Sequence, residues 1–102
     1  MGNSPQKSIT DIFLDHAKTL NIHEKTCNSW APVFISVQRR ISHPDGIGKK
    51  YNHQIAAGLS CHVLAASWKN LDLIMDRVGM QYKLHINVVK EYYKIVSEML
   101  NE

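Results

Sequence analysis

The sequence predicts an all-α protein, a small bundle of about four helices with a long C-terminal helix. Three observations predict it: apolar residues recur at three- and four-residue spacing over most of the chain, residues 51–68 carry no charged side chain, and an apolar seam runs through residues 71–100. The chain has 102 residues, of which 44% are hydrophobic. That length suits one globular domain, so we expect a single helical domain over residues 8–102.

The chain begins with a polar segment, residues 1–7, which contains Pro5 and which we expect to be a flexible tail. Ser8 then stands in the N-cap position of a helix, with Asp11 three residues later, where a side chain can complete a capping box. A helix over residues 9–21 is indicated by apolar residues at helical spacing: Ile9, Ile12, Phe13, Ala17 and Leu20.

A polar connection over residues 21–28 separates this helix from a second one, for which Ser29 is the expected cap. Pro32 suits the first turn of the second helix, where its missing N–H would have no partner anyway. One face of this helix is apolar: Ala31, Val33, Phe34, Val37 and Ile41. Residues 33–41 and 80–88 also show the alternation of a strand, so an α+β fold with strands there is the alternative.

The chain is interrupted at residues 43–48 by Pro44, Gly46 and Gly48, because neither residue type suits a helix interior. The uncharged segment 51–68 that follows is apolar on almost all sides, as expected of a central helix packed by several neighbours. Its polar side chains, such as Asn52 and Ser60, would lack partners in lipid, so we expect no membrane association.

The C-terminal third has the strongest periodicity in the sequence. Its apolar seam advances by three or four residues at each step and predicts one long helix, although Gly79 is a weak point within it. A second apolar flank exceeds what one side of a bundle needs: Leu73, Ile74, Ile95 and Met99. We therefore expect a homodimer, with an interface formed by Ile86, Val89, Tyr93, Val96 and Leu100.

The sequence contains no recognisable catalytic or cofactor-binding motif. The nucleophile pattern G-x-S-x-G and the phosphate-binding patterns G-x-x-x-x-G-K-[ST] and G-x-G-x-x-G are all absent. Six histidines are present, but no two are three or four residues apart, the spacing at which two rings on one helix face hold a metal ion. We therefore expect no enzymatic activity, no metal and no other cofactor.

Cysteine usage and the N-terminus bear on the cellular compartment. Cys27 and Cys61 are too few for a disulfide framework, and we expect both to be buried and reduced. The N-terminus lacks the basic and apolar regions of a secretory signal, so we expect a cytoplasmic protein. The start of the chain resembles an N-myristoylation signal at Gly2, although Gln6 stands where that pattern has serine or threonine.

The positive charge of the chain, +3 in total, gathers in its centre. Residues 31–70 contain five basic residues and one acidic residue, and a basic cluster of this kind can attract a phosphate backbone or an acidic partner. Within it, residues 46–55 read GIGKKYNHQI and resemble the G-I-G-x-K-x-A-x-x-I hairpin of helix–hairpin–helix DNA-binding modules. This chain has Asp45 where that family usually has proline, and Asn52 where it has alanine.

The resemblance implies that the backbone N–H groups of Gly46 and Gly48 approach a phosphate and that Lys50 adds charge. It also implies that Ile47 and Ile55 pack the hairpin. With the neighbouring basic side chains, the candidate nucleic-acid or anion-binding residues are Arg39, Arg40, Gly46, Gly48, Lys49 and Lys50.

We expect a non-enzymatic protein that works by binding another protein, as a small adaptor, inhibitor, chaperone or regulatory subunit. The long apolar seam supports this hypothesis, and so does the absence of a catalytic motif. The alternative is a nucleic-acid-binding module that uses the basic hairpin-like loop.

Overall fold

A computed structural model describes residues 7–101 of the chain. Most of the expected tail, including Gly2, lies outside the described residues, as does Glu102. Between Lys7 and Asn101 the chain forms only helices and connections, so the predicted all-α fold is confirmed and neither 33–41 nor 80–88 is a strand. The elements in chain order are α1 (Ile9–Ala17), α2 (Glu24–Ser42), the 3₁₀ turn η1 (Lys49–Tyr51), α3 (Asn52–Ala65), α4 (Leu71–Tyr82) and α5 (Ile86–Leu100).

Helix α1 begins where the sequence predicts and ends earlier. The Ser8 hydroxyl accepts a hydrogen bond from the Asp11 N–H at 3.1 Å, as the capping pattern indicated. The helix stops at Ala17 instead of residue 21, because Asn21 adopts a left-handed conformation with φ 59° and the Ile22 N–H turns back to the Ala17 carbonyl. Leu20 lies beyond the end of the helix but is still buried, so its apolar side chain belongs to the core.

Helix α2 begins six residues before the predicted start. Its cap is His23, whose Nδ1 accepts the Lys25 N–H at 3.1 Å, and the expected connection over 21–28 is therefore mostly helix. Pro32 consequently lies inside the helix and not in its first turn. An interior proline costs about 3 kcal/mol, so the burial of Phe34, Val37 and Ile41 has to offset that cost.

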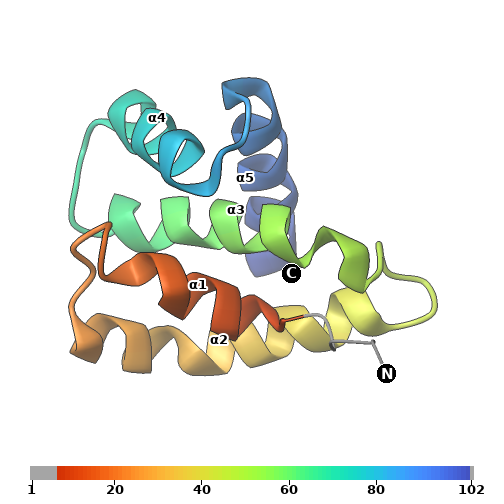
Figure 1. The fold of residues 1–102 in the computed structure, drawn as a ribbon. Coiled ribbons are helices and arrows are strands. Elements are labelled where there is room, and N and C mark those ends of the chain that lie inside the picture. Colours follow the sequence, from red (N-terminus) through yellow and green to blue (C-terminus); the bar gives the residue numbers. More distant parts are fainter. Residues whose placement is uncertain (1–6, 102) are drawn as a thin grey trace, which may run out of the picture.

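Helix α3 is the central helix that the uncharged segment predicted. Figure 1 shows it lying between α1 and α2 on one side and α4 and α5 on the other, and it packs against all four. Its packing with α5 is the most extensive in the described chain. At Gly58 the two backbones come so close that a Cβ would lie 2.7 Å from the Tyr92 carbonyl oxygen.

The predicted long C-terminal helix is wrong, because residues 71–100 form two helices. Lys83 adopts a left-handed conformation with φ 57°, and the Leu84 N–H donates to the Gly79 carbonyl at 2.9 Å, which ends α4. His85 then caps α5 by accepting the Asn87 N–H. The break lets both halves of the seam turn onto the short α3, which one straight helix of about 45 Å could not follow.

Part of the apolar seam in residues 71–100 is buried by other helices of the same chain, which the sequence did not show. Val89 and Val96 are fully buried, Val89 beside Gly79 of α4 and Val96 beside Gly58 of α3. The expectation that these two valines need a partner surface is therefore wrong, while Ile86, Tyr93 and Leu100 are half-buried. The homodimer itself stays a prediction. No helix within residues 7–101 is long and apolar enough to cross a membrane.

Candidate functional site

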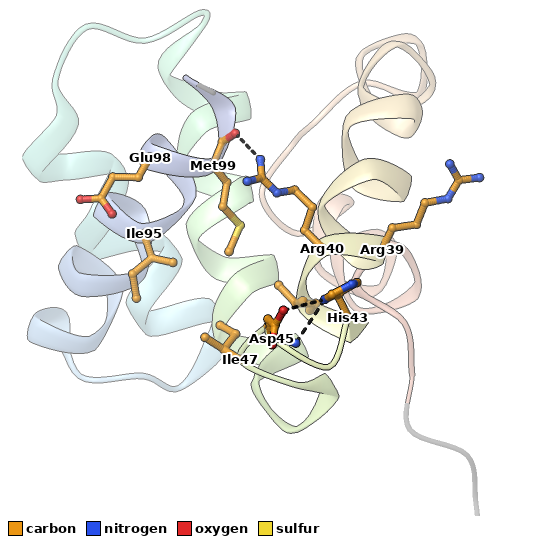
Figure 2. Close-up of a pocket in the computed structure, with 10 residues that line it drawn as sticks. Arg39, Arg40, His43, Asp45, Ile47, Ile95, Glu98 and Met99 are labelled. Carbon is orange, nitrogen blue, oxygen red and sulfur yellow. Dashed lines mark hydrogen bonds and ion pairs between the residues drawn. The ribbon is translucent and has the colours of Figure 1, made fainter.

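A hollow on the described surface lies between α2, the turn at residues 43–47 and the C-terminal half of α5. Its volume is about 580 Å³. Figure 2 shows the α2 side chains on one side of it and those of α5 on the other. The lining residues are Arg39, Arg40, Ile41, His43, Asp45, Gly46, Ile47, Ile95, Glu98 and Met99.

A second hollow of about 310 Å³ continues the first along α2, and the two share Arg40 and Met99. Pro32, Val33 and Leu100 line the second hollow. The two together form one continuous surface, which we call the α2–α5 groove.

Arg40 holds the two walls of the α2–α5 groove together. Its Nη1 donates to the Met99 carbonyl oxygen at 3.0 Å, joining residues 59 positions apart in the sequence. The last turn of α5 has no basic residue of its own, so Arg40 supplies the cation that a helix C-terminus favours. This structural contact accounts for Arg40, which the sequence placed in the candidate anion-binding set.

The floor of the groove is aliphatic. Val33, Ile95, Met99 and Leu100 are half-buried and pack against the core, while Ile47 keeps 37% of its surface exposed. None of the residues that line either hollow is phenylalanine, tyrosine or tryptophan. The groove therefore offers an apolar surface at which a partner could remove aliphatic side chains from water.

The charges at the groove have opposite signs on opposite walls. Arg39 and Arg40 belong to α2, whereas Glu98 belongs to α5 and Asp45 to the turn. Asp45 lies 3.8 Å from the His43 ring. The lining residues include two arginines and two carboxylates, so the groove has no excess positive charge to attract a polyanion. Figure 2 shows the Arg39 guanidinium pointing away from α5.

The glycine loop does not offer its N–H groups to a phosphate. The Gly46 N–H donates to the His43 carbonyl at 2.7 Å, and the Gly48 N–H donates to the Ile41 carbonyl at 2.8 Å. Gly48 has φ +90°, a conformation that favours glycine, and a Cβ on Gly46 would collide with the Arg40 carbonyl. These glycines serve the turn itself, so the phosphate cradle implied by the helix–hairpin–helix resemblance is not formed.

The other features implied by the helix–hairpin–helix resemblance are present only in part. Ile55 is fully buried as expected, but Ile47 faces the groove and does not pack a hairpin. Lys49 and Lys50 are exposed and do not line the groove, and the Lys50 amine lies 5.1 Å from the centre of the Tyr51 ring. Of the six candidate anion-binding residues, the fold brings three to the groove (Arg39, Arg40 and Gly46) and leaves the other three away from it.

A serine–histidine pair lies between α3 and α5. His62 Nε2 is 2.9 Å from the Ser97 hydroxyl, and the His62 ring stacks on Tyr93 with the ring centres 4.2 Å apart. Because the Ser97 hydroxyl donates to the Tyr93 carbonyl at 2.8 Å, the imidazole must be the donor toward Ser97 and cannot accept its proton. The pair therefore joins the two helices and is not arranged as nucleophile and base.

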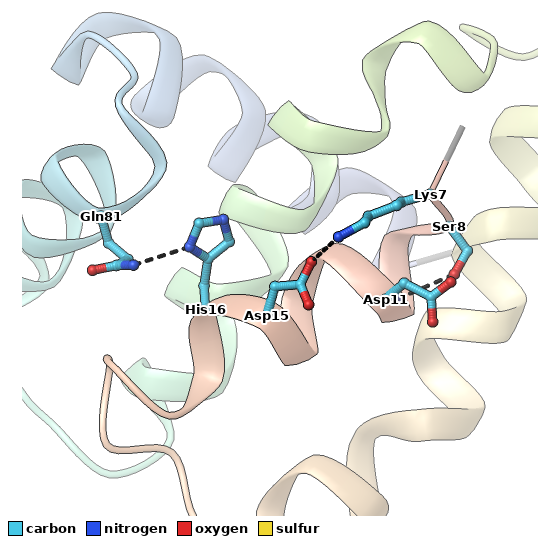
Figure 3. A network of polar contacts seen from close by, with 6 residues as sticks. All are labelled: Lys7, Ser8, Asp11, Asp15, His16 and Gln81. Carbon is cyan, nitrogen blue, oxygen red and sulfur yellow. Dashed lines mark hydrogen bonds and ion pairs between the residues drawn. The ribbon is translucent and has the colours of Figure 1, made fainter. Parts of the chain in front are cut away.

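A second polar cluster joins α1, α3 and α4. Gln81 donates to the His16 ring at 3.1 Å (Figure 3). The centres of the His16 and Tyr82 rings lie 4.0 Å apart. His53 Nε2 donates to the Tyr82 carbonyl at 2.8 Å, and the Tyr82 hydroxyl bonds to the buried Ser60. Each of these side chains has a partner inside the protein, so the cluster acts to position helices.

Two further groups of titratable side chains are structural. Lys7, which precedes α1, and Asp15, in the last turn of α1, form an exposed ion pair at 2.6 Å. Their hydrogen bond raises the pKa of Lys7 and lowers that of Asp15. Cys27 and Cys61 are free and buried, and burial raises the pKa of Cys61 to about 12. Within residues 7–101 no three metal-ligating side chains gather at one place.

Comparisons with protein families, with curated proteins and with solved structures find no match to this chain. The α2–α5 groove is thus identified from geometry alone. Sequence reasoning missed Val33 and Glu98 as parts of a site. The second apolar flank pointed to the groove, since Ile95 and Met99 belong to it and both line the groove.

Proposed function

We propose that this protein acts without catalysis, by binding another protein at the α2–α5 groove. The observation that carries the proposal is the continuous aliphatic floor, which includes the exposed Ile47 and the half-buried Ile95 and Met99. A small adaptor, inhibitor, chaperone or regulatory subunit would work in this way. The two free, buried cysteines suit a reducing compartment, so we also propose a cytoplasmic location.

The charges around the groove support a protein partner over a nucleic acid. The residues that line the groove include two carboxylates, Asp45 and Glu98, which equal its two arginines in number and leave no net positive charge for a phosphate backbone. Since the loop amides at Gly46 and Gly48 already have partners, they add no donors for phosphate oxygens. A protein segment can match both signs of charge at once.

Site-specific photo-cross-linking in extracts of the source cells tests the proposal. A photoreactive residue replaces Ile47, which is exposed at the groove, and in a control protein it replaces Leu73, which is 48% exposed on α4 and lines neither hollow of the groove. We expect a discrete adduct with another protein from position 47 and not from position 73. Identical adducts from both positions, or no adduct from position 47, would contradict the proposal.

A further inference from the structure

We propose that His16 and His53 form a pH-sensitive switch, which releases the C-terminal end of α1 from α3 and α4 when both rings are protonated. The switch is independent of partner binding at the α2–α5 groove. Three features of the fold create it: the hydrogen bond that each ring makes, the short distance between the two rings, and the charges that surround them.

His16 is the polar link between the C-terminal end of α1 and α4. It lies in the last turn of α1, and its Nδ1 accepts a hydrogen bond from the Gln81 side-chain amide at 3.1 Å, as Figure 3 shows. A protonated imidazole carries a hydrogen on both ring nitrogens, so Nδ1 can no longer accept this bond. Protonation of His16 therefore breaks the contact unless the amide of Gln81 turns over.

His53 can gain a proton and keep its contact. Its Nε2 lies 2.8 Å from the Tyr82 carbonyl oxygen, and since a carbonyl only accepts, Nε2 already carries a hydrogen. A second proton goes to Nδ1 and leaves that bond in place. Tyr82 itself stays neutral, because burial raises the pKa of its hydroxyl.

The two histidine rings are close enough for their charges to interact. Their centres lie 6.1 Å apart, so a charge on one ring opposes a charge on the other, and the pair takes up its two protons in separate steps. Burial and, next, the charge on His53 lower the pKa of His16. The second proton thus goes to His16, where it breaks the contact with α4.

The other charged groups near His16 do not neutralise a second proton. Asp15 is the neighbouring carboxylate, but it is paired with Lys7 at 2.6 Å, and Figure 3 shows it turned toward that amine. Asp15 raises the pKa of His16 by less than burial lowers it, and Lys7 lowers that pKa further. Arg77 on α4 is engaged elsewhere, with its guanidinium 5.3 Å from the centre of the Trp68 ring. Moving the end of α1 outward therefore relieves the repulsion between the two charged rings.

The release is confined to the end of α1. Ile9 and Phe13 are fully buried, and the Ile9 N–H donates to the Gln38 side chain at 2.8 Å, so the first part of the helix stays in place. Beyond His16 the chain continues into the connection before α2, in which Leu20 is buried. Opening of this end therefore uncovers Leu20.

Hydrogen exchange of two backbone amides measures the release. The Leu20 N–H donates to the His16 carbonyl at 3.0 Å, and the Ile22 N–H donates to the Ala17 carbonyl at 2.9 Å. We expect the protection factors of both amides to fall about tenfold or more between about pH 7 and pH 5, and that of Val96 in α5 to fall less. An equal fall at Leu20 and Val96, or no fall at Leu20, would overturn the switch.

Two variants and a control locate the response in the histidine pair. His16→Gln removes the charge and leaves an amide that can bond to Gln81, so we expect it to abolish the extra fall at Leu20. His62→Gln is the matched control, because it makes the same substitution at a half-buried histidine on α3 that bonds to α5, and it should keep that fall. An extra fall that persists in His16→Gln, or that disappears in His62→Gln, would contradict the switch.

Titration of the His16 ring by nuclear magnetic resonance tests the coupling and needs only the wild type and His53→Gln. Without the opposing charge of His53, the His16 ring is expected to take up its proton at a higher pH. A His16 titration that His53→Gln leaves unchanged would show that the two rings are not coupled and would overturn the switch.

Discussion

Replacing Gly58 with alanine is expected to destabilise the protein, although alanine is the better helix former. Gly58 lies inside α3, where the backbone of α5 comes close to it. A Cβ at this position would be 2.7 Å from the Tyr92 carbonyl oxygen, 2.9 Å from the Tyr92 carbonyl carbon and 3.0 Å from a methyl group of Val96. Two of these three atoms belong to backbone, so no change of side-chain rotamer can relieve the contact.

Two opposing effects determine the size of the change. Removing a glycine from a helix interior contributes roughly 1 kcal/mol in favour of alanine. Overpacking of a core costs about 1–3 kcal/mol, and the upper end applies where helices must move apart because the clash is with backbone. The net loss is therefore about 1–2 kcal/mol, which corresponds to a fall in Tm of roughly 5–10 °C for a domain of this size.

Thermal and urea unfolding followed by circular dichroism measure this loss. Gly79→Ala is the control, because it makes the same substitution in α4 at a looser contact, where the nearest atom is the Leu84 carbonyl oxygen at 3.1 Å. We expect Gly58→Ala to be the less stable of the two variants. A Gly58→Ala protein as stable as the wild type would show that α3 and α5 are farther apart than the structure has them.

Three further predictions concern pH, nucleic acid and assembly. Burial lowers the pKa of His16 and His62, so their neutral rings stabilise the fold above about pH 6.5, and this stabilisation is lost as the pH falls through the lower folded-state pKa. The Tm should therefore fall between about pH 7 and pH 5. The variant His62→Gln should show a smaller fall in Tm over this range. We expect no mobility shift of an oligonucleotide at low salt, whereas a salt-sensitive shift abolished by Lys49→Glu and Lys50→Glu would establish the nucleic-acid alternative. Light scattering should show a dimer, and a protein that stays monomeric at high concentration would contradict the predicted homodimer. Val89→Glu is expected to unfold the chain at a cost of several kcal/mol, since Val89 is fully buried in one protomer.

Much of the fold could be predicted from local patterns. The Ser8 cap, the interruption at residues 43–48 and the uncharged central helix are all present in the structure. These features depend on short-range chemistry, since a cap bonds to an N–H three residues away and a helix buried on all sides needs apolar residues all round. The start of α2 was missed because His23, a residue type seldom expected as a cap, takes that role.

Periodicity could not show where the C-terminal helix breaks. The four-residue step from Tyr82 to Ile86 suits a continuous helix, yet the chain reverses between them through the left-handed Lys83. Both residues stay on the core side after the break, so the spacing of apolar residues is the same in either arrangement. Packing decides between one continuous helix and two helices, because α4 and α5 have to cover the same short α3.

The sequence by itself determined the helical class, the central helix and the apolar surplus near the C-terminus, because each depends on residues close together in the chain. Only the tertiary structure decided how that surplus is used. It buries Val89 and Val96 against α4 and α3, and it brings Met99 to Arg40 from 59 positions away to form the α2–α5 groove. A groove depends on how far apart two helices lie once a third has packed between them, and no spacing within one helix carries that information.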